Sequence, residues 1–302
     1  MARYEKWLLT ATAKTSSDEV ARSALTERLL AVSFYLKKAV GHGDEEEAIH
    51  QLRVWTRRSA TALDLFAAGL PGSPREKMLK TLHKLRRAAG DVRDCDLQLK
   101  RIKQFSTRFP KYAKKAVKRE RRQAFRKLKK LRHRLRHQDR FSLEIEQLLE
   151  KIAWPKRSKR RRTPAYGILC HRHLAMLSRQ FLRQAKANLH DFSRLHQLRK
   201  HGKSWRYALE LAASVIPASP LQQLYQFLDD VQDRFGLICD QQALLSSLDD
   251  WLGEIRSTRR KPKLVALINV ERNKQNQAYK KLLHWWSPAR LRQLRKLASA
   301  AS

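Results

Sequence analysis

Residues that can be buried recur at three- and four-residue steps along most of the chain, a spacing that predicts amphipathic helices. The clearest run starts near His50 and extends to about Phe66. Because residues at this spacing share one face of a helix, we expect the run to bury a single stripe. The positions of that stripe are Ile49, Leu52, Thr56, Ser59, Leu63 and Phe66.

Another face of this predicted helix is basic. His50, Arg53 and Arg57 recur at helical spacing, and Arg58 lies beside them. A second predicted helix has the same two faces. Its basic residues are His196, Arg199, Lys200, Lys203 and Arg206, followed by Tyr207. Its expected buried stripe is Leu195, Leu198, Gly202, Trp205, Leu209 and Ala212.

The two segments match without a gap, because His196 follows His50 by 146 positions. Six of the fourteen positions from 50 to 63 are identical to their partners. The match extends beyond the loop into the following helix, where Gly90 pairs with Gly236 at the same offset. A gap-free match of this length predicts an internal repeat.

Helical patterns continue along the rest of the chain. Helices are expected over about 18–40, 50–66, 74–89, 91–105, 111–137, 141–152, 165–189, 192–214, 219–235, 238–256, 263–286 and 288–298. The third helix of each half is expected to break at its glycine. The pattern predicts an all-α chain of two tandem units of about 140 residues, each with four main helices.

The predicted organisation is a single domain made of several segments. These are a lead-in over 1–17, a first four-helix half over 18–153, a basic linker over 154–164, a second four-helix half over 165–287 and a short final helix over 288–302. The linker has Pro at both ends and a basic core, which is typical of a charged connector.

Composition adds a strong charge to this picture. The chain has 66 Lys and Arg against 28 Asp and Glu, a formal net charge of +38, while 42% hydrophobic content indicates a folded body. So much like charge favours a polyanionic partner. Three widely spaced cysteines fit a reducing compartment. Neither a signal peptide nor a membrane span is apparent, so we expect a cytoplasmic protein.

The repeated basic faces favour anion binding over catalysis. Arg offers a planar fork of donors to phosphate, Lys a mobile charge, and His a further donor. Residues three and four positions apart rise about 5–6 Å along a helix, so they can contact successive groups of a linear polyanion. Neither copy supplies the converging ligands of a metal site or a paired nucleophile and base. No metal, cofactor or catalytic residue is expected.

At this point the chain resembles the CHAD family, the conserved histidine α-helical domain. The resemblance rests on the two His-led helices and on the glycines at 90 and 236. It implies two four-helix bundles related by a pseudo-twofold axis, with a basic channel between them that binds inorganic polyphosphate. The contacts implied are His50, Arg53, Arg57, Arg58, His196, Arg199, Lys200, Lys203 and Arg206. Polyphosphate granules are then a further expected location.

Two departures from the family's pattern are visible. The first signature helix has Thr61 where a further basic residue is common. The family is often fused to a triphosphate-tunnel domain with an ExExK motif, but the nearest match here has Leu148 in place of the Lys. The resemblance therefore implies a stand-alone binding domain.

Two other functions remain open. The charge alone also fits an RNA- or DNA-binding protein, although no nucleic-acid recognition motif is present and aromatics do not alternate with the basic runs. A phosphoanhydride-processing enzyme would need carboxylates for a divalent metal, and Asp94 and Asp240 are the repeated pair near the motifs. We expect a polyphosphate-binding protein without catalytic activity, with non-specific binding of nucleic acid left open.

Overall fold

The structure, a computed structural model, describes residues 4–41, 45–104, 111–154, 163–185, 189, 191–254 and 261–301. Within these ranges the chain forms helices and no β-strand, which confirms the expected all-α class. The first half contains α1 (Ser17–Val40), α2 (Glu45–Leu65), α3 (Gly72–Gln104), α4 (Lys111–Arg136) and α5 (Arg140–Glu150). The second half contains α6 (Tyr166–Ala185), α7 (Phe192–Leu211), α8 (Ala218–Glu254), α9 (Lys261–Trp285) and α10 (Pro288–Ala300).

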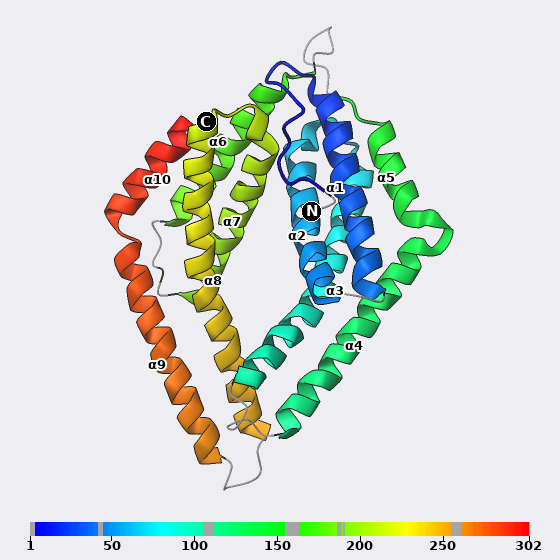
Figure 1. The fold of residues 1–302 in the computed structure, drawn as a ribbon. Helices are drawn as coiled ribbons and strands as arrows, with labels where there is room; N and C mark the ends of the chain where they lie inside the picture. Colours follow the sequence, from blue (N-terminus) through cyan, green and yellow to red (C-terminus); the bar gives the residue numbers. More distant parts are fainter. Residues whose placement is uncertain are drawn as a thin grey trace.

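Each half is a bundle in which helices pack against their neighbours in the chain. In the first half α1 packs on α2, α2 on α3, and α3 on α4. In the second half the same order holds, with α6 on α7, α7 on α8, and α8 on α9. Figure 1 shows α2 and α7 on the inner sides of the two bundles, and these two helices pack against each other. The helices that carry the basic faces therefore join the halves.

A second contact joins the halves at the far ends of their longest helices. Figure 1 shows α3 and α8 converging there. The Gln98 side chain donates a hydrogen bond of 2.9 Å to Ser247 Oγ across this contact. This contact is separate from the one between α2 and α7. A separate apolar cluster lies around this second contact, formed by Cys95, Ile102, Val117, Leu244, Leu245, Leu248, Trp251, Leu264, Leu267 and Ile268.

The segment before α1 also connects the halves. The backbone amide of Leu8 donates to the carbonyl oxygen of Glu210 at 3.0 Å. Gly167, near the start of α6, donates a backbone hydrogen bond to Ala13. A Cβ on Gly167 would lie 3.0 Å from the Ala13 side chain, closer than most Cβ contacts, so glycine favours this close approach. Residues expected to form a weakly patterned lead-in are thus packed against the second half. The central residues of the expected linker, 155–162, lie outside the described ranges.

The third helix of each half differs from the prediction. We expected helices to break at Gly90 and Gly236, but α3 and α8 continue through both positions. Glycine weakens a helix by about 1 kcal/mol relative to alanine without forbidding it, and packing overrides that cost here. The reason for glycine at these positions lies in the candidate site.

Candidate anion-binding site

The two predicted buried stripes of α2 and α7 pack into the protein core. Burial of one face fixes the rotation of each helix about its axis. The basic residues of the other faces are therefore held in defined directions. All six expected positions of each helix are buried: Ile49, Leu52, Thr56, Ser59, Leu63 and Phe66 on the first, and Leu195, Leu198, Gly202, Trp205, Leu209 and Ala212 on the second.

Arg53 and Arg199 each lie against a glycine of the following long helix. The guanidinium of Arg53 donates to the carbonyl oxygen of Gly90 at 3.1 Å. It also forms a 3.3 Å ion pair with Asp94, whose side chain is 67% exposed. A Cβ on Gly90 would lie 3.3 Å from Arg53 Nη1, and a Cβ on Gly236 would lie 2.9 Å from Arg199 Nη2. Glycine thus leaves room for each guanidinium, which explains why both helices carry it.

Arg199 also has an unsatisfied donor. Its Nε is buried and has no hydrogen-bond partner among the described residues. A buried N–H without an acceptor costs on the order of 1–3 kcal/mol. Its backbone carbonyl is satisfied, because the Gln232 side chain donates to it at 3.1 Å. The backbone of Arg199 is therefore satisfied, while part of the donor capacity of its side chain remains free.

Arg57 and Lys203 are half-buried and face other cations across the α2–α7 contact. Burial lowers the pKa of Arg57 to about 10, with Arg53, Arg86 and Arg199 acting in the same direction. Burial lowers the pKa of Lys203 to about 7, helped by the charges of Arg199, Arg57 and others. No described carboxylate forms an ion pair with either side chain. Arg57 and Lys203 thus bring positive charge together without an ion-paired carboxylate of their own.

Arg86 of α3 belongs to the same group, although sequence analysis did not select it. Burial lowers its pKa, and the nearby charge of Arg53 lowers it further. The signal in the sequence was that Arg86 precedes Gly90 by four positions, which places both on one face of α3. We call the five residues Arg53, Arg57, Arg86, Arg199 and Lys203 the cationic cluster.

Three members of the predicted set, His50, His196 and Lys200, are exposed. Burial and neighbouring cations lower the pKa of both histidines, with Arg53 among the cations acting on His50 and Lys200 among those acting on His196. Both imidazoles therefore bind a proton less readily than an ordinary histidine, and an anion bound beside them would raise their pKa values.

Two further predicted contacts are paired with carboxylates that are less exposed than Asp94. Arg58 forms a bidentate ion pair with buried Glu210, at 2.6 Å and 3.1 Å. Arg206 forms an ion pair with Asp229 of α8. Because these carboxylates neutralise their partners, the charge available to an external anion comes mainly from the cationic cluster.

The described residues offer no alternative centre for metal chemistry. They contain no group of three or more His, Cys, Asp or Glu side chains placed to hold a metal ion. Asp94 and Asp240, the carboxylates considered for metal binding, are both exposed, and Asp94 is paired with Arg53. None of the helices in the described ranges is long and apolar enough to cross a membrane.

Comparison with known proteins agrees with this architecture. The structure of the CHAD domain from the plant Ricinus communis superposes with a TM-score of 0.69 at 19% identity, covering 100% of this chain and 98% of that one. PptA from Streptomyces chartreusis superposes with a TM-score of 0.64 at 15% identity, covering 90% of this chain and 99% of that one. At these identities the similarity concerns the fold.

Sequence comparison gives the family. None of the curated protein sequences compared with the chain matches it. The family model of the CHAD domain, however, matches residues 23–249. That range includes both basic helices and the glycine positions of both long helices, so the predicted resemblance is confirmed. The chain belongs to the CHAD domain family.

Proposed function

We propose that the protein binds inorganic polyphosphate through the cationic cluster, together with His50, His196 and Lys200 at its edges. The single observation that carries this proposal is the position of Arg57 and Lys203. They come from different halves, are half-buried, and are surrounded by cations without an ion-paired carboxylate among the described residues. Such an arrangement is unfavourable in the free protein and becomes favourable when an anion occupies it. The association of the CHAD family with polyphosphate supports this choice of ligand.

A linear phosphate polymer suits the cluster better than a nucleic acid. Arg53 and Arg57 are four residues apart, so they rise about 6 Å along α2 and can contact successive parts of one chain. The side chains of Trp55, Trp205 and Tyr207 are buried, while Phe192, at the start of α7, is 37% exposed and packs against Tyr279. Bases would therefore find one partly exposed ring on these two helices and no row of rings on which to stack. Polyphosphate carries charge on every unit and requires no such platform.

We further propose that the two halves are an internal repeat with a pseudo-twofold relationship, so that a basic channel lies between them. Two equivalent contacts support it. Arg53 lies against Gly90 and Arg199 against Gly236, and both members of the second pair follow those of the first by 146 positions. Superposing α2–α3 on α7–α8 is expected to align these pairs. If the pairs failed to align, the relationship would be limited to sequence.

The central test compares two variants with the same change in charge. The cluster variant replaces Arg53, Arg57, Arg199 and Lys203 with Gln. We expect it to lose at least about 100-fold in polyphosphate affinity, because buried charge-assisted contacts contribute far more than screened surface charge.

The control variant replaces Lys280, Arg292, Arg295 and Lys296 with Gln. All four of these residues are exposed on α9 and α10. The control should lose less than about threefold in affinity, since exposed charges contribute only screened attraction. Circular dichroism and thermal melting should show both variants folded, because a collapsed bundle would also lose binding. Equal losses in two folded variants would replace the cluster with diffuse surface attraction.

Competition at physiological salt tests the ligand class. Unlabelled polyphosphate should displace labelled polyphosphate at a much lower phosphate concentration than duplex DNA or RNA. Equal displacement by nucleic acid would favour the nucleic-acid alternative.

The proposal makes the protein a binding protein without turnover. Polyphosphate incubated with the protein and Mg²⁺ is expected to keep its chain length, and release of orthophosphate would instead support the enzyme alternative. The same proposal places the protein in the cytoplasm, including polyphosphate granules. Fluorescence microscopy of the tagged protein tests this location.

A further inference from the structure

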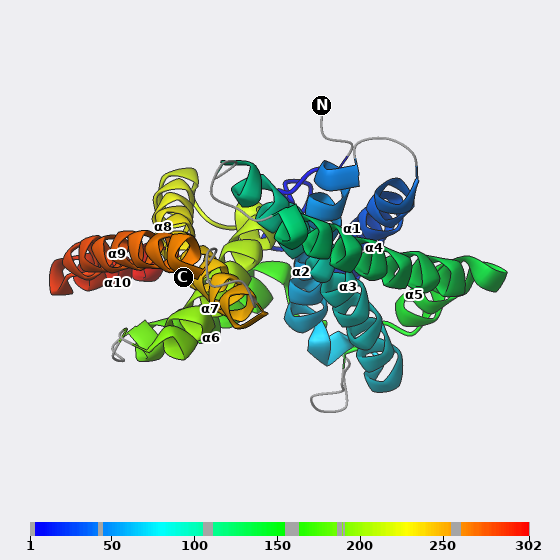
Figure 2. The same cartoon turned by 90° about the horizontal axis from the view of Figure 1, so that it is seen from below.

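Helix α4 carries far more positive charge than its place in the fold requires. Fourteen of its 26 residues are Lys or Arg. Helix α9, which packs on α8 as α4 packs on α3, has six Lys or Arg among its 25 residues. Figure 2 shows α4 running along the outside of the first half. The excess charge therefore needs an explanation other than packing.

The charges of α4 are ordered along the helix. Its buried positions Val117, Ala124 and Leu128 lie on one side. Directly opposite is a continuous stripe at steps of three and four residues, which we call the α4 stripe. Its members, all exposed, are Lys115, Arg119, Arg122, Arg126 and Lys130. Exposed cations flank the stripe on both sides, including Lys114, Lys118, Lys127, Lys129 and Arg134.

The α4 stripe has no ion-paired carboxylate among the described residues. An ion pair elsewhere on α4, between Arg121 and Asp96, lies beside the buried line. Each pair of like charges four positions apart destabilises a helix by about 0.2–0.5 kcal/mol. The free protein therefore contains an extended surface of repelling charges that a polyanion would neutralise.

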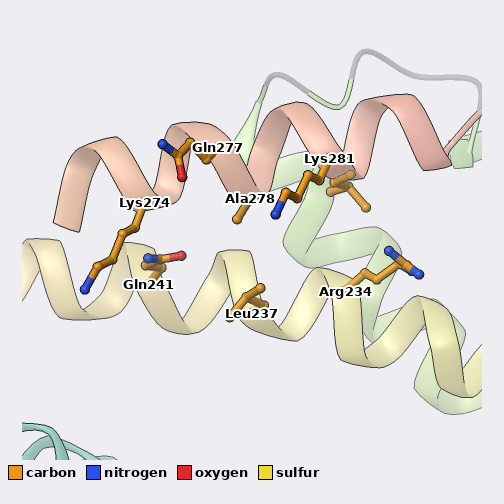
Figure 3. Close-up of a pocket in the computed structure, with 8 residues that line it drawn as sticks. Arg234, Leu237, Gln241, Lys274, Gln277, Ala278 and Lys281 are labelled. Carbon is orange, nitrogen blue, oxygen red and sulfur yellow. The ribbon is translucent and has the colours of Figure 1, made fainter. Parts of the chain in front are cut away.

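The surface between α8 and α9 shows how different the stripe is. A hollow of about 330 Å³ lies there, and its cations Arg234, Lys274 and Lys281 alternate with neutral side chains. Figure 3 shows neutral residues, Leu237 and Ala278 among them, between these cations. Lys274 is also paired with a carboxylate of its own helix. The uninterrupted basic surface of α4 thus has no counterpart on α9.

We propose that the α4 stripe binds the phosphate backbone of double-stranded DNA without reading its bases. The stripe runs from Lys115 to Lys130, fifteen residue steps or about 22 Å of helix. The flanking cations make the basic surface wider than the stripe itself. A wide surface can contact both of the phosphate strands that border a DNA groove. A single linear polymer would neutralise one line of it. The stripe exposes no aromatic side chain, so stacking of single-stranded bases has no platform.

This surface is separate from the proposed polyphosphate site. Helix α4 packs against α3, α1 and α5, whereas the cationic cluster comes from α2, α3 and α7. The stripe and the cluster share no helix, although α3 packs beside both. Each site can therefore be altered without changing the residues of the other.

The test measures binding of a short labelled DNA duplex to the full-length protein by fluorescence anisotropy across a salt series. The stripe variant replaces all five stripe residues with Gln. Removing five phosphate contacts should reduce the slope of log affinity against log salt by about 4.5. We expect the dissociation constant for DNA at moderate salt to rise at least about 30-fold in this variant.

The matched control again removes five charges from the surface. It replaces the exposed residues Lys280, Lys281, Arg292, Arg295 and Lys296 with Gln. The dissociation constant for DNA should rise less than about threefold in this variant, because these residues form no continuous stripe. Equal loss of DNA binding in the stripe and control variants would overturn the proposal.

Two further measurements keep the outcome decisive. A smaller variant, Lys115→Gln with Arg119→Gln, should reduce the slope of log affinity against log salt by about 2. This variant keeps the test valid if the larger variant fails to fold. The cluster variant should retain DNA binding, and the stripe variant should retain binding of short-chain polyphosphate. Parallel loss of polyphosphate binding in the stripe variant would also overturn the proposal, because it would assign α4 to polyphosphate.

Discussion

Arg58 of α2 and Glu210 of α7 form a bidentate ion pair that joins the two halves of the molecule. The two nitrogen–oxygen distances are 2.6 Å and 3.1 Å. The hydroxyl of Tyr225 donates to the same carboxylate at 2.9 Å, and the guanidinium carbon of Arg58 lies 4.7 Å from the centre of the Trp55 ring. Glu210 is buried, with its side chain 1% exposed. The carboxylate is therefore fully occupied by partners from both halves.

Glu210→Gln is expected to destabilise the fold, because it leaves the Arg58 charge buried without its counterion. Loss of one partner from a buried pair typically costs about 3–5 kcal/mol. Urea unfolding followed by circular dichroism measures the loss. The double variant Arg58→Met with Glu210→Leu removes both charges and should recover most of the stability. A double variant no more stable than Glu210→Gln would contradict this account.

Gly236→Ala is expected to weaken polyphosphate binding while the helix itself stays stable. The added Cβ would lie 2.9 Å from Arg199 Nη2 and displace the guanidinium, whereas alanine favours the helix by about 1 kcal/mol. Gly90→Ala should have a smaller effect, since its Cβ would lie 3.3 Å from Arg53. Gly253→Ala in α8 is the control, because nothing lies within 4 Å. Calorimetric titration and thermal melting separate affinity from stability.

Polyphosphate affinity is expected to fall as the pH rises from about 6 to about 9. The pKa of Lys203 is about 7 in the free protein, against 10.5 for an ordinary lysine. A bound polyanion raises this pKa, so binding takes up a proton at pH values between the free and bound pKa, and affinity falls by up to about tenfold per pH unit there. Lys203→Arg, which stays charged, should flatten the profile. An unchanged profile in this variant would assign the dependence to other groups.

Lys203→Met is expected to stabilise the free protein while weakening polyphosphate binding. The fold lowers the pKa of Lys203, so the charged form is disfavoured in the folded state. Removing it should raise the melting temperature by a few degrees. The gain should be larger at about pH 6, where the amine is charged, than at about pH 9. A lower melting temperature at the acidic pH would show that the lysine contributes favourable packing that outweighs its charge.

The sequence was enough to predict the helices and the direction in which α2 and α7 present their faces. Both depend on local periodicity, and all twelve stripe positions proved buried. Periodicity did not reveal that α3 continues through Gly90, because the cost of a single glycine in a helix is smaller than the gain from packing. The role of that glycine depends on Arg53, which is distant in sequence.

The charge pairings could not be predicted from the sequence for a different reason. Arg53 and Arg58 look alike on the predicted basic face, yet Arg58 pairs with the buried carboxylate of Glu210, 152 positions away, whereas Arg53 pairs with the exposed carboxylate of Asp94. Arg86 was missed because position 232, its partner at the repeat offset, is Gln. Contacts between helices that are distant in the sequence decide which cations remain available to bind an anion.

The second contact between the halves, where Gln98 meets Ser247, limits how the molecule can move. Two bodies joined along one line can hinge about it, but a second attachment at a distance removes that freedom. The helices that carry the cationic cluster are then held in position before any anion arrives. The free energy of folding already includes the mutual repulsion of these cations. Binding of an anion therefore requires little further reorganisation of the protein. Hydrogen exchange in α2 and α7 should therefore slow on binding while the helix positions stay unchanged.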